Sequence, residues 1–550
     1  MLYYGREEPR KPESGGRLPT ALVFPGKRSL ALSTLGWQAV YRLLAGCSEL
    51  AVERFFPTPG TAPISEEGTV LSAFPVVALS VNVEEELLHL LDVLEAGGVP
   101  SAKAGRPDFP LVIAGGPLAF LNPAPLSPLA DLLFIGEAEA GLRDLLVEIK
   151  SLWMAGVSKT ETLDAVKNRP GVYVPGLSAT PVRRVIAPGP GLPDPAFSCF
   201  IGSDTTFKDT LLLEVNRGCP YGCRFCAAGY VYRPPRHARI QDLKQIVEST
   251  NPPKVGLVGT ALTDWPDLLP FLIWLKERKT KFSLSSLRAD GLTEELLAFL
   301  RVCGLRTITL ALEAPSMRLR DMASKKLDPN DFLEAVRLCS SHGVNHLRIY
   351  LITGWPGETD DDYAELDSFL TEVVALRDAS QKRKKEFMRI TLGVSCLVPK
   401  PHTPFQWAPM ASEADLDRRM KQLKTMTKRH RGVTLSPDNP SQARLQGLLA
   451  RGGEDIFGLA QLALKLGGWK KALYQWKGDA TLMDRELGRN DPLPWDVIDS
   501  GVSKDFLWKE WLRSKEQKPS PGCPDKGCAH CRRCGVDELP SLDSNLEPSV

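Results

Sequence analysis

Six short apolar segments recur in the middle of the chain, and segments with helical periodicity separate them. Strand–helix units in series predict parallel strands whose crossover helices cover the sheet. Six such units predict a complete or partial βα barrel, in which the chemistry lies on the loops after the strands. The six strand-like runs are LLLEV at 211–215, VGLV at 255–258, FSLSS at 282–286, TITLAL at 307–312, LRIYLI at 347–352 and RITLGVS at 389–395.

The first 186 residues contain a similar alternation. It predicts a doubly wound, Rossmann-like parallel sheet, whose ligands bind beyond the carboxyl ends of the strands. Glycines at two such ends, in IAGGP and IGEAE, are candidate cofactor-binding positions: Gly115, Gly116 and Gly136. The strand-like runs are TALVFP at 20–25, PVVALS at 75–80, FPLVIAGGP at 109–117 and DLLFIGEAE at 131–139.

The segment APGPGLPDP at 187–195 cannot hold a helix or a central strand, so it predicts a linker. After about residue 410 the pattern becomes helical and more polar. The predicted fold class is therefore α/β, with a helical extension. The predicted parts are a Rossmann-like domain at 1–186, a linker at 187–204, a barrel core at 205–410 and a C-terminal extension at 411–550, with a tail from 537 that is expected to fray.

The composition is that of an ordinary globular protein, with 43% hydrophobic and 24% charged residues and a net charge of +2. This balance indicates neither a nucleic-acid nor a membrane partner. No apolar run approaches the roughly 20 residues that span a bilayer, and the first residues lack a secretion-signal pattern, so a cytoplasmic protein is expected. Two basic stretches, 381–387 and 418–431, leave a nucleic-acid partner open but are interpreted as solvated helix faces.

Three cysteines crowd the loop after the first of the six strands, in RGCPYGCRFCAAGY at 217–230. Thiolates at this density suit iron–sulfur or soft-metal ligation. Structural metal sites use four protein ligands, so three leave one position for a non-protein ligand. The alternative is a zinc site that a distant residue such as His237 completes. The candidate ligands are Cys219, Cys223 and Cys226.

The spacing C-x3-C-x2-C, with the aromatic Phe225 before the last cysteine, resembles the signature of the radical SAM superfamily over roughly residues 205–410. The resemblance implies a (β/α)6 partial barrel. It also implies that Cys219, Cys223 and Cys226 hold a [4Fe-4S] cluster whose fourth iron binds S-adenosylmethionine (SAM). One electron then cleaves SAM to a 5′-deoxyadenosyl radical. A donor such as ferredoxin or flavodoxin would supply that electron.

The same resemblance gives roles to residues on later loops. In VGTALTD, which lacks the usual Gly-Gly-Glu, Gly259, Thr260 and Asp264 would lie near the methionine amino group. Glu313, in LALEAP, would bind the ribose, and Arg318 would pair with the methionine carboxylate. The alternatives are an ordinary βα turn, a helix-capping glutamate and a surface arginine.

Two more loops resemble the cobalamin-binding class of the superfamily. They are GWPGET, with Gly354 and Pro356, and VPKPHTPFQW, which places His402 at the mouth of the active site. The N-terminal domain resembles the cobalamin-binding domain of that class, but the motif D-x-H-x-x-G is absent. Its one histidine, His89, lies on a leucine-rich helix and is interpreted as a packing residue. A Rossmann-like module that binds no corrinoid is the alternative.

Four further cysteines lie within twelve residues near the C-terminus, in CPDKGCAHCRRC. Part of this spacing is that of ferredoxin-type loops, and four thiolates also suit zinc. The sequence therefore predicts a second iron–sulfur cluster or a zinc site there. Together with the barrel, the motif after its sixth strand and LPWDVIDSGVSKDFL at 493–507, this cysteine-rich end resembles a group of cobalamin-domain radical SAM proteins. The candidate ligands are Cys523, Cys528, Cys531 and Cys534.

Together these features predict a radical SAM enzyme that methylates or otherwise modifies an unactivated carbon with the help of cobalamin. Its substrate is not readable from the sequence. A second hypothesis is a corrinoid-free radical SAM enzyme that uses the tail cluster for sulfur insertion or electron relay. A third is a non-catalytic iron–sulfur or electron-transfer module.

Overall fold

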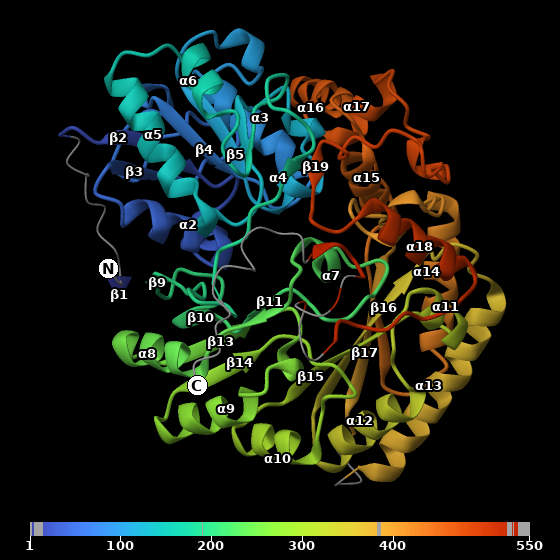
Figure 1. Cartoon of the computed structure of the whole chain (residues 1–550). Helices are drawn as coiled ribbons and strands as arrows, with labels where there is room; N and C mark the ends of the chain where they lie inside the picture. The colour runs from blue at the N-terminus through green and yellow to red at the C-terminus, as the bar shows by residue number, and fades with distance from the viewer. Residues whose placement is uncertain are drawn as a thin grey trace.

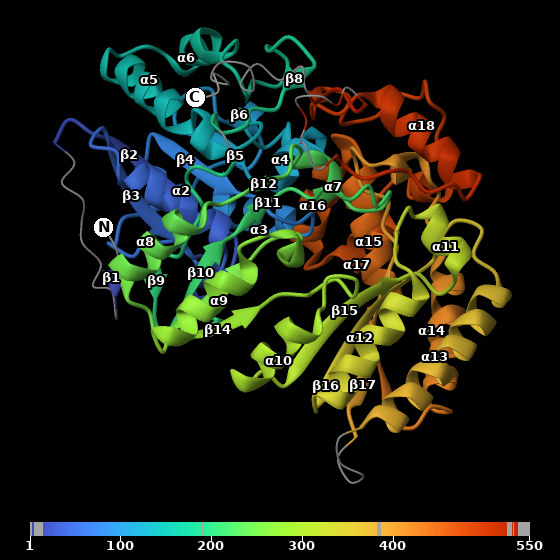
Figure 2. The same ribbon diagram turned by 60° about the horizontal axis from the view of Figure 1, so that its bottom comes forward.

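The structure, a computed structural model, describes residues 3–4, 15–189, 191–381, 387–524, 528, 531 and 533–536. The tail from residue 537 and most of the basic stretch at 381–387 lie outside these residues. Figures 1 and 2 show three parts along the chain: an N-terminal α/β unit, a curved parallel sheet with helices outside it, and a helical C-terminal region that returns to both.

The N-terminal unit is built on a six-stranded sheet in the order β3-β2-β4-β5-β6-β7. Five strands are parallel, and β7 runs antiparallel to β6 at one edge. The interior strands read as continuous apolar runs because both faces of the sheet are covered. The strands are β2 (Leu18–Val23), β3 (Leu50–Phe55), β4 (Val76–Ser80), β5 (Leu111–Gly115), β6 (Leu132–Phe134) and β7 (Val172–Tyr173).

Helices pack on both faces of this sheet, so it is doubly wound as predicted. One face packs with α3 in a core that includes Val77, Leu79 and Leu90. The other face packs with α2 and α5 in a second core that includes Leu22 and Trp37. The helices of the unit are α1 (Arg28–Ala31), α2 (Leu35–Ala45), α3 (Glu86–Ala96), α4 (Pro117–Leu121), α5 (Leu142–Met154) and α6 (Lys159–Val166).

The six predicted barrel strands are present, and all are parallel. They form two sheets, β10-β13-β14 and β15-β16-β17-β18, joined by a bridge between Leu287 and Leu310. The seventh strand, β18 (Val433–Pro437), was not predicted, because it is a short, polar edge strand that ends in proline. The others are β10 (Thr210–Glu214), β13 (Lys254–Val258), β14 (Lys281–Leu284), β15 (Thr307–Glu313), β16 (His346–Thr353) and β17 (Arg389–Cys396).

Helices cover the outer face of this half-barrel, while its inner face is accessible. Along β16 every second residue is buried, beginning with Leu347 and Ile349, whereas Arg348 and Tyr350 between them are exposed. Strands with one solvated face leave room for a ligand on that face. The covering helices are α8 (Ile240–Thr250), α9 (Leu268–Glu277), α10 (Glu294–Val302), α11 (Met317–Met322), α12 (Pro329–Ser341), α13 (Asp360–Ser380) and α14 (Glu413–Thr427).

The C-terminal extension packs back onto both earlier parts. Its strand β19 (Ile498–Asp499) pairs in parallel with β8 (Val182–Arg183), which follows the N-terminal sheet. Helix α16 packs on α3, and α18 packs on α11 and on the 404–407 turn (Figures 1 and 2). The helices of the extension are α15 (Pro440–Arg451), α16 (Asp455–Leu466), α17 (Trp469–Gln475) and α18 (Lys504–Lys515).

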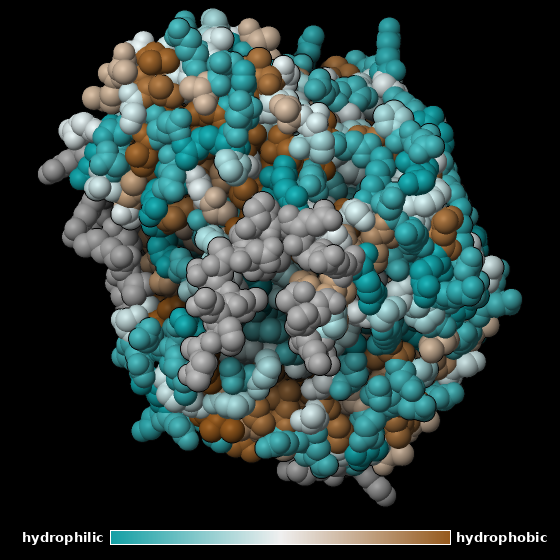
Figure 3. Space-filling model, in the orientation of Figure 1, coloured by the Kyte–Doolittle hydropathy of each residue, from teal (hydrophilic) through white to brown (hydrophobic). Residues whose placement is uncertain are grey.

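Three arginines of the basic 418–431 stretch form ion pairs with carboxylates of α13. Arg418 and Arg419 pair with Asp360, and Arg429 pairs with Asp367. Hydrophobic residues on the face in Figure 3 lie in separate areas between hydrophilic ones. Within the described ranges, no helix combines the length and the apolar character that a membrane span requires.

Candidate active site

A two-stranded antiparallel ribbon closes the three-cysteine loop at its base. Strands β11 (Asn216–Arg217) and β12 (Arg236–His237) pair with each other immediately beyond the carboxyl end of β10. Gly218 turns the chain into the loop with a φ of +81°, and a Cβ there would lie 2.4 Å from the Tyr232 carbonyl oxygen. Only glycine fits both the conformation and the space, so the loop is anchored directly before Cys219.

The three predicted cysteines lie together on this loop and are partly buried. A tight turn brings the last two close, with the Cys226 N–H donating to the Cys223 carbonyl at 3.0 Å. Burial raises the pKa of Cys219 to about 11 and that of Cys223 to about 12. Among the described residues no three side chains already stand close enough to hold a metal ion, so the sulfurs must converge and lose their protons on binding iron.

A buried ion pair borders two of the thiols. The Lys325 ammonium lies 3.1 Å from a Glu313 carboxylate oxygen. Both groups act electrostatically on Cys223 and Cys226. Glu313 ends β15 with a φ of +68°, next to a shift in register, and this turns its side chain toward the loop. The structure therefore brings Glu313 to the cysteines as predicted, while no sequence signal singled out Lys325.

A second charged group borders Cys219. Tyr221 donates a hydrogen bond of 3.0 Å to Asp264, and the Arg288 guanidinium lies 3.6 Å from the centre of the Tyr221 ring. Arg288 also pairs with Asp290. Asp264 was a predicted site residue, and Tyr221 and Arg288 were not. The charge of Arg288 stabilises the thiolate form of Cys219, whereas burial and the carboxylate of Asp264 oppose it.

Gly259 and Thr260 join the β13 loop to the base of the cysteine loop. The Thr260 N–H donates to the Asn216 side-chain oxygen at 2.8 Å, and its hydroxyl donates to the Gly218 carbonyl. A Cβ on Gly259 would lie 2.4 Å from the same Asn216 oxygen. Both residues therefore have an internal structural role, and their predicted contact with SAM remains a prediction.

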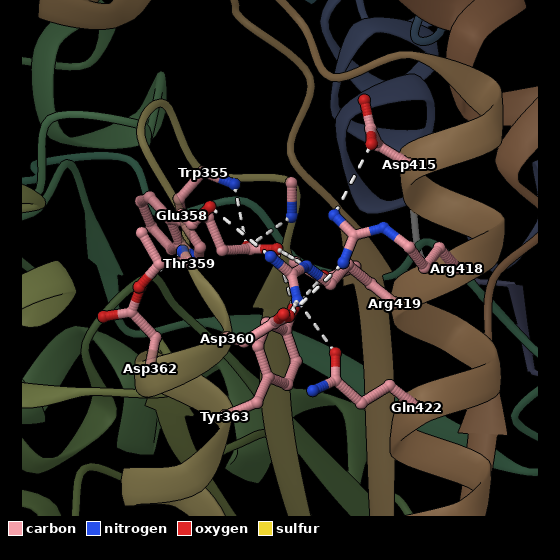
Figure 4. A network of polar contacts seen from close by, with 12 residues as sticks. Trp355, Glu358, Thr359, Asp360, Asp362, Tyr363, Asp415, Arg418, Arg419 and Gln422 are labelled. Carbon is pink, nitrogen blue, oxygen red and sulfur yellow. Dashed lines mark hydrogen bonds and ion pairs between the residues drawn. The ribbon is translucent and has the colours of Figure 1, made fainter.

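Arg318 and the GWPGET turn belong to one polar network at the start of α13. Arg318 pairs with Asp362 at 2.6 Å and donates to the Gly357 carbonyl. Glu358 accepts from the N–H groups of Gly354 and Trp355, and Arg419 binds it at 2.9 Å (Figure 4). These contacts hold the turn containing Gly354 and Pro356 rigid, and they engage Arg318 within the protein. A cofactor role for these residues remains a prediction.

Arg224 fixes the cysteine loop to the C-terminal extension. Its side chain is completely buried and binds Glu510 at 3.0 Å. It also donates to the Met322 carbonyl, the Lys518 carbonyl and the Ser520 hydroxyl. The next residue, Phe225, meets Trp355 edge to face with ring centres 5.5 Å apart. The two residues between Cys223 and Cys226 are thus held by parts of the chain far away in sequence.

His402 lines a cavity of about 350 Å³ together with residues of the extension such as Trp495 and Lys504. Its side chain is buried, and burial lowers its pKa to about 4, so the ring is neutral near pH 7. No residue of the 217–230 loop lines this cavity. The predicted place of His402 at the active-site mouth therefore stays a prediction.

Two of the three candidate glycines in the N-terminal unit are packed against the chain itself. A Cβ on Gly116 would lie 2.6 Å from the Val81 carbonyl oxygen, and one on Gly136 would lie 2.2 Å from the Val185 carbonyl oxygen. Gly115 faces open space. Close backbone packing accounts for Gly116 and Gly136, and only Gly115 leaves room for a ligand.

Glu137, next to Gly136, links the N-terminal unit to the cysteine loop. Its carboxylate binds Arg236 and, at 3.0 Å, Arg217. Burial alone would raise the pKa of Glu137, but the hydrogen bond to Arg236 and the two positive charges hold it at about 2, against an ordinary 4.5. The carboxylate therefore stabilises the folded state at neutral pH.

Replacing Glu137 by glutamine should lower the free energy of unfolding by about 3 kcal/mol at pH 7. Because the folded pKa is depressed, this stabilisation is complete above about pH 5 and disappears as the pH falls through 4.5 toward 2. Denaturant unfolding of both proteins across this range measures the effect. The exposed Glu248→Gln is the control, and a wild-type-to-variant difference that does not change with pH contradicts the assignment.

The first of the tail cysteines, Cys523, lies against the same loop. Its N–H donates to the carbonyl of Pro220, which follows Cys219, at 2.7 Å. Cys528, Cys531 and Cys534 are also described, but several residues between them are not. Nothing in the sequence indicates that Cys523 and the cysteine loop are neighbours, because about 300 residues separate them.

Comparison with protein families matches two segments of the chain. Residues 36–175 match "Radical SAM proteins, N-terminal", and residues 213–370 match "Radical SAM superfamily". The second match runs from the end of β10 through the cysteine loop to β16 and into α13. The two matches therefore cover the N-terminal sheet except β2, and most of the half-barrel.

Curated relatives agree with these matches. An uncharacterized protein of Methanocaldococcus jannaschii is 26% identical over 88% of this chain and 98% of its own length. A 2-(S-pantetheinyl)-carbapenam-3-carboxylate methyltransferase of Streptantibioticus cattleyicolor is 35% identical over 22% of this chain and 18% of its own length. A ribosomal protein uS12 methylthiotransferase of Nitratidesulfovibrio vulgaris is 29% identical over 29% of this chain and 41% of its own length.

Solved structures with a similar course of the chain include two radical SAM enzymes. The methyltransferase TsrM of Kitasatospora setae is 13% identical, with a TM-score of 0.47 over 72% of this chain and 80% of its own. The cobalamin-dependent enzyme OxsB is 17% identical, with a TM-score of 0.45 over 91% of this chain and 79% of its own. From the family matches and the three-cysteine loop, the chain belongs to the radical SAM superfamily and is a radical SAM enzyme.

Proposed function

We propose that Cys219, Cys223 and Cys226 hold a [4Fe-4S] cluster at which SAM is cleaved, and that the resulting radical modifies an unactivated carbon. The observation that carries this proposal is the position of three thiols on one anchored loop beyond the carboxyl end of β10. When bound, the cluster supplies the single electron that splits SAM into methionine and the 5′-deoxyadenosyl radical. The electron donor is a protein of the ferredoxin or flavodoxin class in the cytoplasm.

Residues around the thiols orient the bound groups. Lys325 balances the negative charge of the thiolates, and its ion pair with Glu313 holds that carboxylate at the edge of the loop. Arg288, stacked on Tyr221, places a second positive charge near Cys219. The accessible inner face of the half-barrel, with Arg348 and Tyr350, is where the substrate lies.

Methylation with the help of cobalamin is the reaction that we favour. The turn GWPGET and the loop VPKPHTPFQW support it, as does the 35% identity with a methyltransferase over 130 residues. A bound cobalamin would supply the methyl group. Gly115 fits a ligand at the carboxyl end of β5, whereas Gly116 and Gly136 are filled by the chain's own backbone. Residues other than these two glycines must therefore hold the corrinoid.

A second candidate reaction is sulfur insertion without a corrinoid. The observation in its favour is that the Cys523 N–H is hydrogen-bonded to the Pro220 carbonyl on the cysteine loop, which supports a role for the tail thiols near the proposed cluster. The 29% identity with a methylthiotransferase over 186 residues also supports it. The first candidate reaction requires a bound corrinoid, and the second does not.

Anaerobic reconstitution tests the function. The protein is purified without oxygen, loaded with iron, sulfide and hydroxocobalamin, and desalted. Iron, zinc and corrinoid are then measured, together with 5′-deoxyadenosine formed from SAM and a strong reductant. Corrinoid near one per chain with deoxyadenosine supports methylation, whereas deoxyadenosine without corrinoid selects the second reaction. If the protein holds iron on the 217–230 loop but forms no deoxyadenosine, even with cell extract added as a source of substrate, both candidate reactions are refuted.

A further inference from the structure

The inner face of the half-barrel carries a row of hydrogen-bonding side chains around one arginine. Leu347, Ile349 and Leu351 of β16 pack in the core beneath α12 and α13 (Figure 2), so the residues between them point into the concavity. The register of the strands sets four of these inner-face residues side by side at one level: Thr309 on β15, Arg348 on β16, Thr391 on β17 and Thr434 on β18. Arg348 therefore lies among hydroxyl groups on one continuous surface.

The guanidinium of Arg348 has no anionic partner in the described part of the chain. The residue is exposed, and its side chain forms neither a hydrogen bond nor an ion pair there. Nearer the cysteine loop, by contrast, Arg288 and Arg318 are paired with aspartates. Glu313 carries the one carboxylate among the inner-face positions of β15 to β18, and it pairs with Lys325. An anion for Arg348 must therefore come from a ligand.

An aromatic ring lies one level closer to the cysteine loop than Arg348. Tyr350 follows it by two residues on the same face of β16 and is 43% exposed. Its neighbours in register are Ala311 and Gly393, and a Cβ on Gly393 would lie 3.0 Å from Cδ1 of the ring. These two small residues leave room for the ring. It offers a substrate apolar contact area between the arginine and the loop.

The strands also set the length of the path from Arg348 to the cysteines. Glu313, which acts electrostatically on Cys223 and Cys226, lies four residues beyond Thr309 on β15. At the usual rise of a strand, these four residues span roughly 10–13 Å. An anion at Arg348 and a reacting carbon at the loop would therefore lie at opposite ends of an elongated molecule.

Further cations lie at the amino end of the concavity. Lys254 and Lys281 are opposite each other in register on β13 and β14, and Arg389 is opposite His346. Within the described ranges, none of these two lysines and Arg389 forms an ion pair. Burial, and then the charges of Arg348 and Arg389, lower the pKa of His346. Positive charge is therefore concentrated at this end, where it attracts anions into the half-barrel.

We propose that the substrate is a small organic anion, whose carboxylate or phosphate group binds Arg348 and whose carbon skeleton runs past Tyr350 toward the cysteine loop. Its role as substrate rests on the proposed function, whereas its binding does not. A guanidinium presents two parallel N–H donors that match the oxygens of either anionic group. The Thr309 hydroxyl beside Arg348 is a further donor.

A small molecule fits this surface better than a nucleic acid does. A polymer of phosphates needs a basic surface that follows its backbone. The basic stretch at 418–431 does not supply one, because Arg418, Arg419 and Arg429 are already paired with aspartates. The unpaired cations instead surround one concavity.

Isothermal titration calorimetry tests the binding on the whole protein, without the need for a cluster. The probes are phenyl phosphate and benzoate, with benzamide as the neutral counterpart. We expect both anions to bind and benzamide not to. Arg348→Met should weaken the binding of both anions at least about tenfold, and Arg348→Lys should weaken it less, because the charge remains. Arg337→Met, on the outer side of α12, is the matched control and should bind both anions as wild type does.

Tyr350→Ala is a second variant, independent of the arginine. It should lower the affinity for phenyl phosphate at least about threefold and leave the affinity for inorganic phosphate unchanged, because only the first has an apolar part. Equal losses for the two probes would contradict the path past Tyr350. Thermal unfolding of each variant shows whether the protein is folded during the titrations.

Several results would overturn the proposal. They are no binding of either anion, binding of benzamide equal to that of benzoate, and anion binding that Arg348→Met leaves unchanged. Binding of a single-stranded RNA more tightly than either anion, and dependent on Arg348, would make the ligand a nucleic acid instead.

A reaction assay separates failure of this proposal from failure of the proposed function. Reconstituted wild-type protein receives the small-molecule fraction of a cell extract before or after passage over an anion-exchange resin. We expect the resin to remove the stimulation of deoxyadenosine formation. Full stimulation by the flow-through would show that the substrate is not an anion. If the proposed function is wrong, no deoxyadenosine forms with either fraction, while the anions still bind in a manner that depends on Arg348.

Discussion

Cys223→Ala is expected to lower deoxyadenosine formation at least about a thousandfold. Two remaining thiols cannot hold a cluster that needs three protein ligands, and without the cluster no electron reaches SAM. Lys325 and Glu313 also act electrostatically on Cys223. The rate is measured with dithionite under anaerobic conditions, together with the iron content.

Cys303→Ala serves as the matched control, since it removes a thiol from the outside of the barrel. Its rate should equal that of the wild type. If Cys223→Ala retained more than about a tenth of the wild-type rate with its iron intact, the loop would not be the site of SAM cleavage.

Arg224→Met should lower the free energy of unfolding by about 3–5 kcal/mol. The substitution leaves the buried Glu510, whose side chain is 7% exposed, with only the half-exposed Arg513 at 3.9 Å as a cationic partner, and it also frees the carbonyls of Met322 and Lys518. Denaturant unfolding measures the loss. The double variant Arg224→Met/Glu510→Leu should recover a large part of it, because the unpaired charge is gone.

The exposed ion pair between Arg337 and Glu334 is the control for these variants. Its side chains are 42% and 54% exposed, so breaking it should cost at most about 0.5 kcal/mol. Equal losses of unfolding free energy at the two pairs would contradict the prediction that burial makes the Arg224–Glu510 pair the more costly one to break.

Four strands of the N-terminal sheet were predictable because parallel strands covered on both sides leave continuous apolar runs in the sequence. β3, whose run is interrupted by Glu53 and Arg54, and the two-residue β7 were not predicted. β18 was missed because Thr434 and Ser436 make it polar and Pro437 ends it. The doubly wound arrangement followed from alternation alone. The return of the extension onto both earlier parts did not follow, because helical periodicity shows that a face is apolar but not which surface covers it.

The cysteine loop was predictable because all three ligands lie within eight residues of sequence. The charged groups around it were not, since Lys325 and Arg288 come from other loops and become neighbours only in the folded chain. At Gly136 the sequence suggested a ligand where the structure shows a packing contact. A glycine at a strand end predicted a cofactor-binding position, but the Val185 backbone lies against it. Sequence does not distinguish the close approach of a ligand from the close approach of the chain's own backbone.

The contacts of Arg224 also have a consequence for synthesis of the protein. Its partner Glu510 lies 286 residues further along the chain. At about 5–20 residues per second, roughly 15–60 s pass on the ribosome before that partner exists. During this interval the cysteine loop and its half-barrel can be complete while the extension is not. The cysteine loop thus lacks its contacts with the extension until the extension, made last, packs against it.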